Sequence, residues 1–178
     1  MLNAYGENLK EYEEWVVLRN GMKVFLRPIT PEDGSLLVDL FNKLSPHSIY
    51  LRFLRHLHAL PEEWVYRFTH VNYRSDFALA GILNEDVGES CIAVARYHYN
   101  PLTERTDLAI AVRDDMQNLG LGSIMLAKLV GIAIKNGILH FEGTLDPQNA
   151  ISMKILSKLG LKMKTFMKGT LCYIELDA

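Results

Sequence analysis

Short apolar runs alternate with polar breaks along the chain, and their spacing predicts a mixture of strands and helices. The runs at Trp15 to Leu18 and Met22 to Leu26 flank Asn20-Gly21, a pair typical of a tight β-hairpin turn. Lys168-Gly169 joins the last two predicted strands, the second of which is the alternating Thr170 to Leu176. Further strands are predicted at Phe77 to Leu83, Cys91 to Tyr97, Thr106 to Val112 and Ile138 to Leu145. The acidic turn 84–88 joins the first two of these.

The first predicted helix has a well-marked start. Thr30 can cap it, Pro31 occupies its first position and Asp33 completes a turn that resembles a capping box. Its apolar stripe comprises Leu36, Leu37, Leu40, Phe41 and Leu44. Two shorter helices are predicted at Ser48 to Leu57 and Pro61 to Phe68, the second burying Trp64, Val65 and Phe68, and later helices are predicted from Ser123 onward and at Ala150 to Leu159.

The composition is that of an ordinary globular protein. The length of 178 residues, with 49% hydrophobic and 22% charged residues, predicts a single domain, 1–178, with a large core. A net charge of −2 excludes the strongly basic surface of a general nucleic-acid binder. Residues 1–14 are polar and acidic, unlike a signal peptide, and no apolar run approaches the ~18 residues of a membrane span. We therefore expect a cytoplasmic protein with no nucleic-acid or membrane partner.

The cysteines and histidines do not form a metal-binding pattern. Cys91 and Cys172 lie in apolar, strand-like segments without the spacing of a zinc site, so buried free thiols are expected. His56 and His58 would share one side only in a strand, whereas their segment is predicted to be helical. We expect no metal.

The chemistry of the chain centres on the segment from Asp107 to Ser123, where a predicted strand leads into a glycine loop and then a helix. Gly120 and Gly122 lie at the predicted helix start and let the backbone come close to a ligand. The unpaired amides of a first helical turn, with the positive end of the helix dipole, favour an anion. A pyrophosphate fits such a cradle.

Two familiar nucleotide motifs match this loop poorly. The dinucleotide-binding fingerprint needs a third glycine, and that position is Met125. The P-loop needs a lysine before its Ser or Thr, and Gly122 is followed directly by Ser123 and Ile124.

The arrangement Gln117-x-x-Gly120-x-Gly122 after a strand resembles the acetyl-CoA loop of the GNAT N-acetyltransferase superfamily. The downstream strand, then Asp146-Pro147-Gln148-Asn149, a helix and Gly160-Leu161, is similar to that family as well. Upstream, LRPITPEDGSLLVDLFNKLSPHSIYLRFL resembles the start of the GNAT domain in bacterial protein-lysine acetyltransferases that modify acyl-CoA synthetases. The two regions together extend from about Met22 to Leu161.

The resemblance implies an α/β (α+β) GNAT fold, with flanking helices on a twisted, mostly antiparallel sheet. Its central strands at Asp107 to Val112 and Ile138 to Leu145 are expected to run parallel and to separate around the ligand. The implied reaction is direct acetyl transfer from acetyl-CoA, the cosubstrate, to a primary amine. The acceptor is expected to be a protein lysine, such as one on an acyl-CoA synthetase. A small-molecule amine acetyltransferase and a non-catalytic acyl-CoA sensor stay open as alternatives, as does an oligomer.

The same resemblance implies which residues bind acetyl-CoA. Relatives commonly place a basic residue near the pyrophosphate, where this chain has Asn118-Leu119. The 3′-phosphate is therefore expected to involve Lys154 or Lys158. The full expected set is Ile110, Ala111, Val112, Gln117, Asn118, Leu119, Gly120, Leu121, Gly122, Ser123, Asn149 and Lys158.

The expected general base is Asp107, at the position of a Glu in relatives, ten residues before Gln117. Strand rise places Asp107 about 16 Å from Val112, similar to the reach of a pantetheine arm. Burial there would raise its pKa toward a useful range, and the short side chain suggests a bridging water. Glu142 is the alternative carboxylate. Where many relatives carry a Tyr as general acid, this chain has Leu156.

The acceptor groove is expected in the region from Ser45 to Tyr73, which lies between the first helix and the central strands. This region carries several aromatic residues, and Glu62 and Glu63 could attract a lysine.

Overall fold

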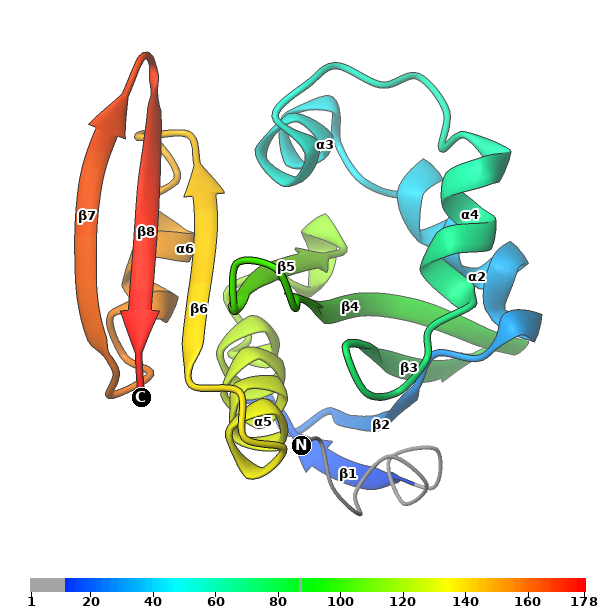
Figure 1. The fold of residues 1–178 in the computed structure, drawn as a ribbon. Helices are drawn as coiled ribbons and strands as arrows, with labels where there is room; N and C mark the ends of the chain where they lie inside the picture. Colours follow the sequence, from blue (N-terminus) through cyan, green and yellow to red (C-terminus); the bar gives the residue numbers. More distant parts are fainter. Residues whose placement is uncertain (1–11, 87) are drawn as a thin grey trace.

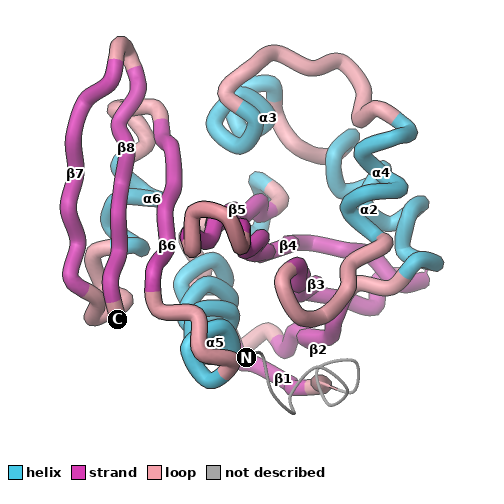
Figure 2. Tube along the Cα trace, viewed as in Figure 1, coloured by secondary structure: helices cyan, strands magenta, loops and turns pink. Residues whose placement is uncertain are grey.

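The computed structural model describes residues 12–86 and 88–178, which form an eight-stranded sheet with helices on both faces (Figures 1 and 2). Most of the acidic start of the chain and Val87 of the predicted turn lie outside the described residues. The strand order is β1-β2-β3-β4-β5-β6-β8-β7. The strands are β1 (Glu14–Val17), β2 (Lys23–Pro28), β3 (Asp76–Glu85), β4 (Gly88–Asn100), β5 (Arg105–Val112), β6 (His140–Leu145), β7 (Lys162–Lys168) and β8 (Leu171–Asp177).

The sheet is antiparallel except where β5 meets β6, and that exception creates the central opening of the fold. Register between these two parallel strands is limited to Thr106 with Phe141 and Asp107 with Glu142. Beyond these pairs the two strands diverge (Figure 1). The expected mixed sheet with a parallel, splayed central pair is therefore confirmed.

The helices lie in two layers. The first layer contains α2, α3 and α4, and side chains from all three meet Val94 and Ala111 on one face of the sheet. The second layer contains α5, which packs on β3, β4 and β5 from the opposite face and also contacts α6. The helical segments are the short 3-10 turns η2 (Pro31–Asp33) and η3 (Asp114–Met116), with α2 (Gly34–Asn42), α3 (Pro46–Phe53), α4 (Glu62–Thr69), α5 (Leu121–Lys135) and α6 (Ala150–Leu156).

The hairpin and the first helix form as the sequence predicts. β1 pairs antiparallel with β2, and Gly21 in the turn has a φ of 84°, which glycine adopts without steric cost. The backbone N–H of Thr30 donates to Asp33 Oδ2 at 2.8 Å, which is one half of the expected capping box. The same carboxylate accepts hydrogen bonds from both terminal nitrogens of Arg27, each at 2.7 Å. This ion pair fastens the start of the helix to the adjoining strand β2.

The core lies on both faces of the central strands. Its largest fully buried side chains include Phe77, Tyr97, Met125, Leu129 and Phe141. Cys91 and Cys172 are buried free thiols, as predicted. Burial raises the pKa of the Cys91 thiol to about 12, so this group stays protonated at neutral pH.

The helix predicted at Ser48 to Leu57 ends earlier than the sequence indicated. α3 stops at Phe53, because Leu54 adopts a left-handed conformation with a φ of 53° and turns the chain away. His56 and His58 consequently lie in the irregular segment before α4, and the prediction that they are helical is wrong.

Two other predictions differ from the structure in detail. Trp64, Val65 and Phe68 of α4 are only half-buried, because α4 lies at the periphery of its layer. The helix predicted to reach Leu159 ends at Leu156, before the left-handed Gly160. Among the described residues, no helix is long and apolar enough to cross a membrane.

Candidate functional site

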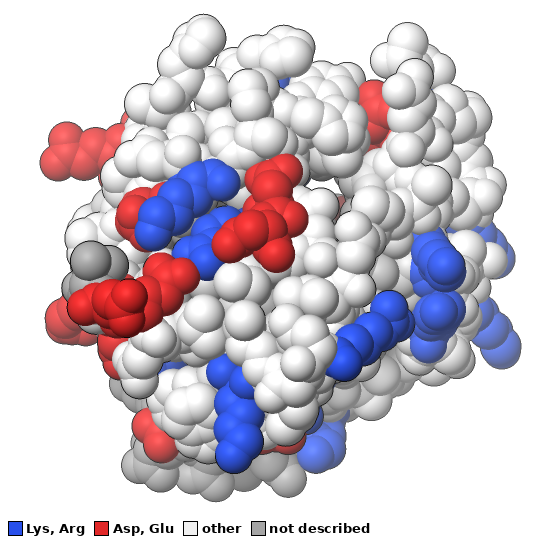
Figure 3. Space-filling model, turned by 180° about the vertical axis from the view of Figure 1, so that it is seen from behind, with Lys and Arg blue, Asp and Glu red and all other residues white. Residues whose placement is uncertain are grey.

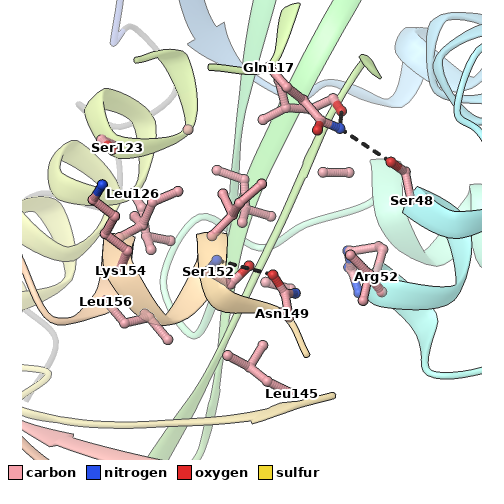
Figure 4. Close-up of a pocket in the computed structure, with 18 of the residues that line it drawn as sticks. Ser48, Arg52, Gln117, Ser123, Leu126, Leu145, Asn149, Ser152, Lys154 and Leu156 are labelled. Carbon is pink, nitrogen blue, oxygen red and sulfur yellow. Dashed lines mark hydrogen bonds between the residues drawn. The ribbon is translucent and has the colours of Figure 1, made fainter. Parts of the chain in front are cut away.

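A cavity of about 470 Å³ opens where β5 and β6 diverge. One wall is the end of β5 with the following glycine loop and the start of α5, a second wall is α6, and the third is α3. Figure 4 shows Arg52 of α3 facing Asn149 and Ser152 of α6 across this cleft. The cleft is therefore built from segments that are far apart in the sequence.

The glycine loop forms the corner of the cleft at the start of α5. Gly120 has a φ of 94° and occupies the N-cap position of α5. The first hydrogen bond of the helix runs from the N–H of Ile124 to the carbonyl of Gly120, at 3.1 Å. The amides that precede Ile124 are thus left for a ligand, at the positive end of a 15-residue helix.

Gln117 joins the loop to α3. Its Nε2 donates to the carbonyl of Val112 at 3.1 Å and to Ser48 Oγ at 3.2 Å (Figure 4). Asp114 accepts hydrogen bonds from the hydroxyls of Ser45 at 2.7 Å and Ser48 at 2.8 Å. Burial raises the pKa of Asp114, but these hydrogen bonds outweigh it and lower the pKa overall. The N-terminus of α3 is thereby fixed against the loop.

The α6 wall is held by its own cap and by α3. Asn149 is buried, and its side-chain oxygen accepts from the N–H of Ser152 at 3.1 Å. Tyr50 of α3 donates to Asp146 Oδ2 at 3.0 Å and so connects the two walls. Lys154 and Lys158 of α6 line the cleft. Figure 3 shows the molecule from behind, with some Lys and Arg side chains among Asp and Glu side chains and others toward the right-hand edge.

Most of the residues expected to bind acetyl-CoA line this cleft. Leu119 and Leu121 do not, and the side chain of Leu121 is 1% exposed in the core, so only its backbone faces the loop. The expected residues that do line it are Ile110, Ala111, Val112, Gln117, Asn118, Gly120, Gly122, Ser123, Asn149 and Lys158.

Sequence reasoning missed two arginines in the cleft. The N–H of Arg19 donates to the carbonyl of Leu119 at 3.1 Å, and its Nε would lie 3.5 Å from a Cβ added at Gly120. Arg19 thus places a basic side chain beside the loop, where Asn118 and Leu119 offer none. Arg52 projects from α3 on the other side. Neither is close in sequence to the glycine motif, so the motif carried no signal for them.

Asp107 lies at the beginning of β5, one residue before the part of this strand that lines the cleft. By strand alternation its side chain shares a face with Ala109 and Ala111, both of which line the cleft. The expectation that Asp107 is buried is wrong, because it follows the exposed 101–104 turn and is itself exposed. Its partner in the register, Glu142, has a raised pKa, first through burial and then through the charge of Asp107.

The region from Ser45 to Tyr73, expected to form the acceptor groove, contains both buried and exposed residues. Tyr73 is buried and donates its hydroxyl to the carbonyl of Ile29 at 2.9 Å, so it belongs to the core. Tyr66 is 63% exposed, and Glu62 and Glu63 at the start of α4 are exposed as well.

Two further observations bear on the chemistry of the site. Leu156 lines the cleft and offers no proton to a leaving group. Within residues 12–86 and 88–178, no group of three His, Cys, Asp or Glu side chains is arranged to hold a metal ion.

Comparison with known proteins gives matches to acetyltransferases. The family model of the acetyltransferase (GNAT) domain matches residues 23–162. An acetyltransferase of Pseudomonas aeruginosa is 27% identical over 151 residues, which cover 84% of this chain and 81% of that protein. The acetyltransferase Pat of Mycolicibacterium smegmatis is 29% identical over 152 residues, 82% of this chain but 43% of Pat. The chain thus spans less than half of that relative.

A solved structure with a similar fold is the GNAT domain of the S. lividans protein PAT. It superposes with a TM-score of 0.85 at 28% identity, covering 94% of this chain and 98% of that domain.

Proposed function

Because the chain belongs to the GNAT acetyltransferase family, we propose that it is an acetyl-CoA-dependent N-acetyltransferase whose acceptor is a lysine side chain of a protein. The observation that carries the proposal is the glycine loop at the start of α5, open toward a cleft between two diverging strands. The likeness to the GNAT domain of S. lividans PAT and to mycobacterial Pat supports a protein acceptor. We also propose that residues 1–178 form a single GNAT acetyltransferase domain.

The residues of the cleft fit the parts of acetyl-CoA. The free amides at the start of α5 and the nearby guanidinium of Arg19 suit the pyrophosphate. Lys154 and Lys158 suit the 3′-phosphate. The backbone groups of β5 from Leu108 to Val112 have no partners in β6, because the register between the strands stops at Asp107. These groups can hydrogen-bond an extended pantetheine arm as a neighbouring strand would.

Proton removal from the acceptor is assigned to Asp107. Acetyl-CoA supplies a thioester, and acetyl transfer forms a C–N bond as the C–S bond breaks. The amine reacts only when neutral, so an ammonium must first lose a proton. Asp107 faces the α3 side of the sheet, and Glu142 is its neighbour in the register of the parallel strands.

The acceptor is proposed to approach along the α3 and α4 side of the sheet. Asp107 faces this side, whereas the phosphate-binding loop lies at the opposite end of β5. The exposed carboxylates of Glu62 and Glu63 lie at the start of α4 and favour a cationic side chain. The reacting amine and the phosphates would therefore enter the cleft from different ends.

The proposal is tested by mixing the protein with acetyl-CoA and with panels of intact proteins, lysine peptides and small amines. Free CoA release and acetyl-lysine, located by mass spectrometry, are expected with protein acceptors. Rapid transfer to small amines alone would identify a small-molecule acetyltransferase. Tight acetyl-CoA binding with no CoA release for any acceptor would identify a sensor.

A further inference from the structure

Arg52 stands at the boundary between the cleft and a second, smaller cavity. It extends from α3 and lines both spaces. Its guanidinium carbon lies 4.8 Å from the centroid of the Phe53 ring, which accounts for part of its packing. Arg52 and Arg96 are the two positively charged residues that line the smaller cavity.

The charge of Arg52 is not neutralised by the described part of the chain. No carboxylate there lies within 4.0 Å of its guanidinium, and no described group accepts a hydrogen bond from it. Arg96, in contrast, is paired with Asp76 at 3.0 Å. Burial and then the charge of Arg96 lower the pKa of Arg52 to about 10, so it remains protonated at neutral pH. A bound anion would neutralise the positive charge of Arg52, which is otherwise unfavourable because it is buried near that of Arg96.

Apart from Arg52 and Arg96, the residues that line the smaller cavity are apolar. Its walls include Leu37, Leu40, Phe41, Phe68 and Val94, and it adjoins the cleft at Ala111. Ala109 and Ala111 are small, so the cleft has room above β5 between the strand and α3. A short aliphatic chain fits these walls, whereas a folded acceptor protein does not enter so small a space.

We propose that the cleft also accepts CoA thioesters whose acyl chain ends in a carboxylate, and that Arg52 binds that carboxylate. The inference rests on the proposed use of the cleft for acyl-CoA. A guanidinium forms two parallel hydrogen bonds with a carboxylate, which fixes the chain end in direction as well as position. Acyl transfer from such a donor makes and breaks the same bonds as acetyl transfer. The amide C–N bond forms, the thioester C–S bond breaks, and the amine proton passes to the base.

The test compares two donors that differ only at the chain end. Succinyl-CoA carries a terminal carboxylate where butyryl-CoA, of equal chain length, carries a methyl group. In titration calorimetry the wild type is expected to bind succinyl-CoA at least about tenfold more tightly than butyryl-CoA. Arg52→Met should remove this preference, and Arg52→Lys should keep part of it. Arg55→Met is the matched control, since Arg55 packs on Trp64 at 5.5 Å and lines neither cavity.

The proposal is overturned if the wild type does not discriminate between the two donors, or if Arg52→Met retains the full preference. Both readouts need no acceptor, so a failure to find a protein substrate leaves them unaffected. Binding of neither donor would refute the acyl-CoA cleft itself. If Arg52→Met does not fold, the wild-type comparison and Arg52→Lys still decide the question.

Discussion

Asp107 and Glu142 occupy opposite positions in the register of the parallel strands β5 and β6, so both carboxylates project from the same face of the sheet. Glu142 Oε2 lies 4.0 Å from Arg105 Nε, which limits the mutual repulsion of the two acids. Burial and the charge of Asp107 nevertheless raise the pKa of Glu142. In the proposed reaction, this pair would take the proton from the acceptor amine.

Asp107→Asn is expected to lower turnover by about 10²-fold or more, because the amide cannot accept a proton. Affinity for acetyl-CoA should be retained, because Asp107 lies outside the cleft wall. The rise of the wild-type rate with pH should be lost in the variant. Steady-state kinetics over a range of pH, with calorimetry for binding, measure both effects.

Glu142→Gln is the matched control for that prediction. If Asp107 is the base, this change should reduce turnover far less than Asp107→Asn. The reverse order would assign the base to Glu142, and near-normal turnover in both variants would assign it to a water chain. Loss of cofactor binding in Asp107→Asn would show a structural role for this residue.

Charge reversal at Glu62 and Glu63 tests the acceptor groove. The double change to Lys is expected to raise the KM for a lysine-containing protein by about threefold or more, because exposed charges steer association. Glu13→Lys provides a control at an exposed carboxylate beside β1. An unchanged KM for every active acceptor would place the groove elsewhere.

Asp33→Asn tests the ion pair that anchors the first helix. Asp33 is 4% exposed, and burial raises its pKa, but the hydrogen bonds from Arg27 and Thr30 outweigh burial and lower the pKa overall. A lowered pKa contributes stability above the ordinary carboxyl pKa, and this contribution is lost as the pH falls through the folded-state value. The variant should be about 3 kcal/mol less stable at neutral pH, since Arg27 then keeps only the more distant carboxylate of Glu89, at 3.8 Å.

The same comparison in acid completes the test. The difference in unfolding free energy between Asp33→Asn and the wild type, measured with urea, should narrow as the pH falls below the ordinary carboxyl pKa of about 3.9. Asp39→Asn removes a half-exposed carboxylate that pairs with Lys43 at 2.9 Å, and it should cost no more than about 0.5 kcal/mol. A loss of unfolding free energy in Asp33→Asn that is the same at every pH would contradict the role assigned to the charge of Asp33.

Local sequence patterns predicted the parts of this fold that depend on neighbouring residues. Asn20-Gly21 indicated the hairpin, Thr30 to Asp33 indicated the helix start, and Gln117 to Gly122 indicated the loop, because each depends on backbone preferences within a few positions. The end of α3 was misplaced because apolar residues continue past Phe53, although Leu54 leaves the helix.

The parts of the site that sequence reasoning missed depend on distant segments. Arg19 reaches Gly120 from the first hairpin, and Arg52 enters the cleft from α3. No spacing in the sequence reports such contacts, because tertiary packing alone brings the segments together. The exposure of Asp107 likewise follows from its place at the beginning of a strand, where neighbouring elements do not cover it.

The measurement that most directly tests the central claim is the affinity for acetyl-CoA of two glycine variants. Gly120 and Gly137 both have positive φ, of 94° and 81°, at opposite ends of α5. A valine at either position strains the backbone, whereas only position 120 faces the cleft. Calorimetry should show that Gly120→Val weakens acetyl-CoA binding by about tenfold or more, ~1.4 kcal/mol, while folded Gly137→Val binds as the wild type does. Equal affinity in folded Gly120→Val would contradict the assignment of this loop to the cofactor.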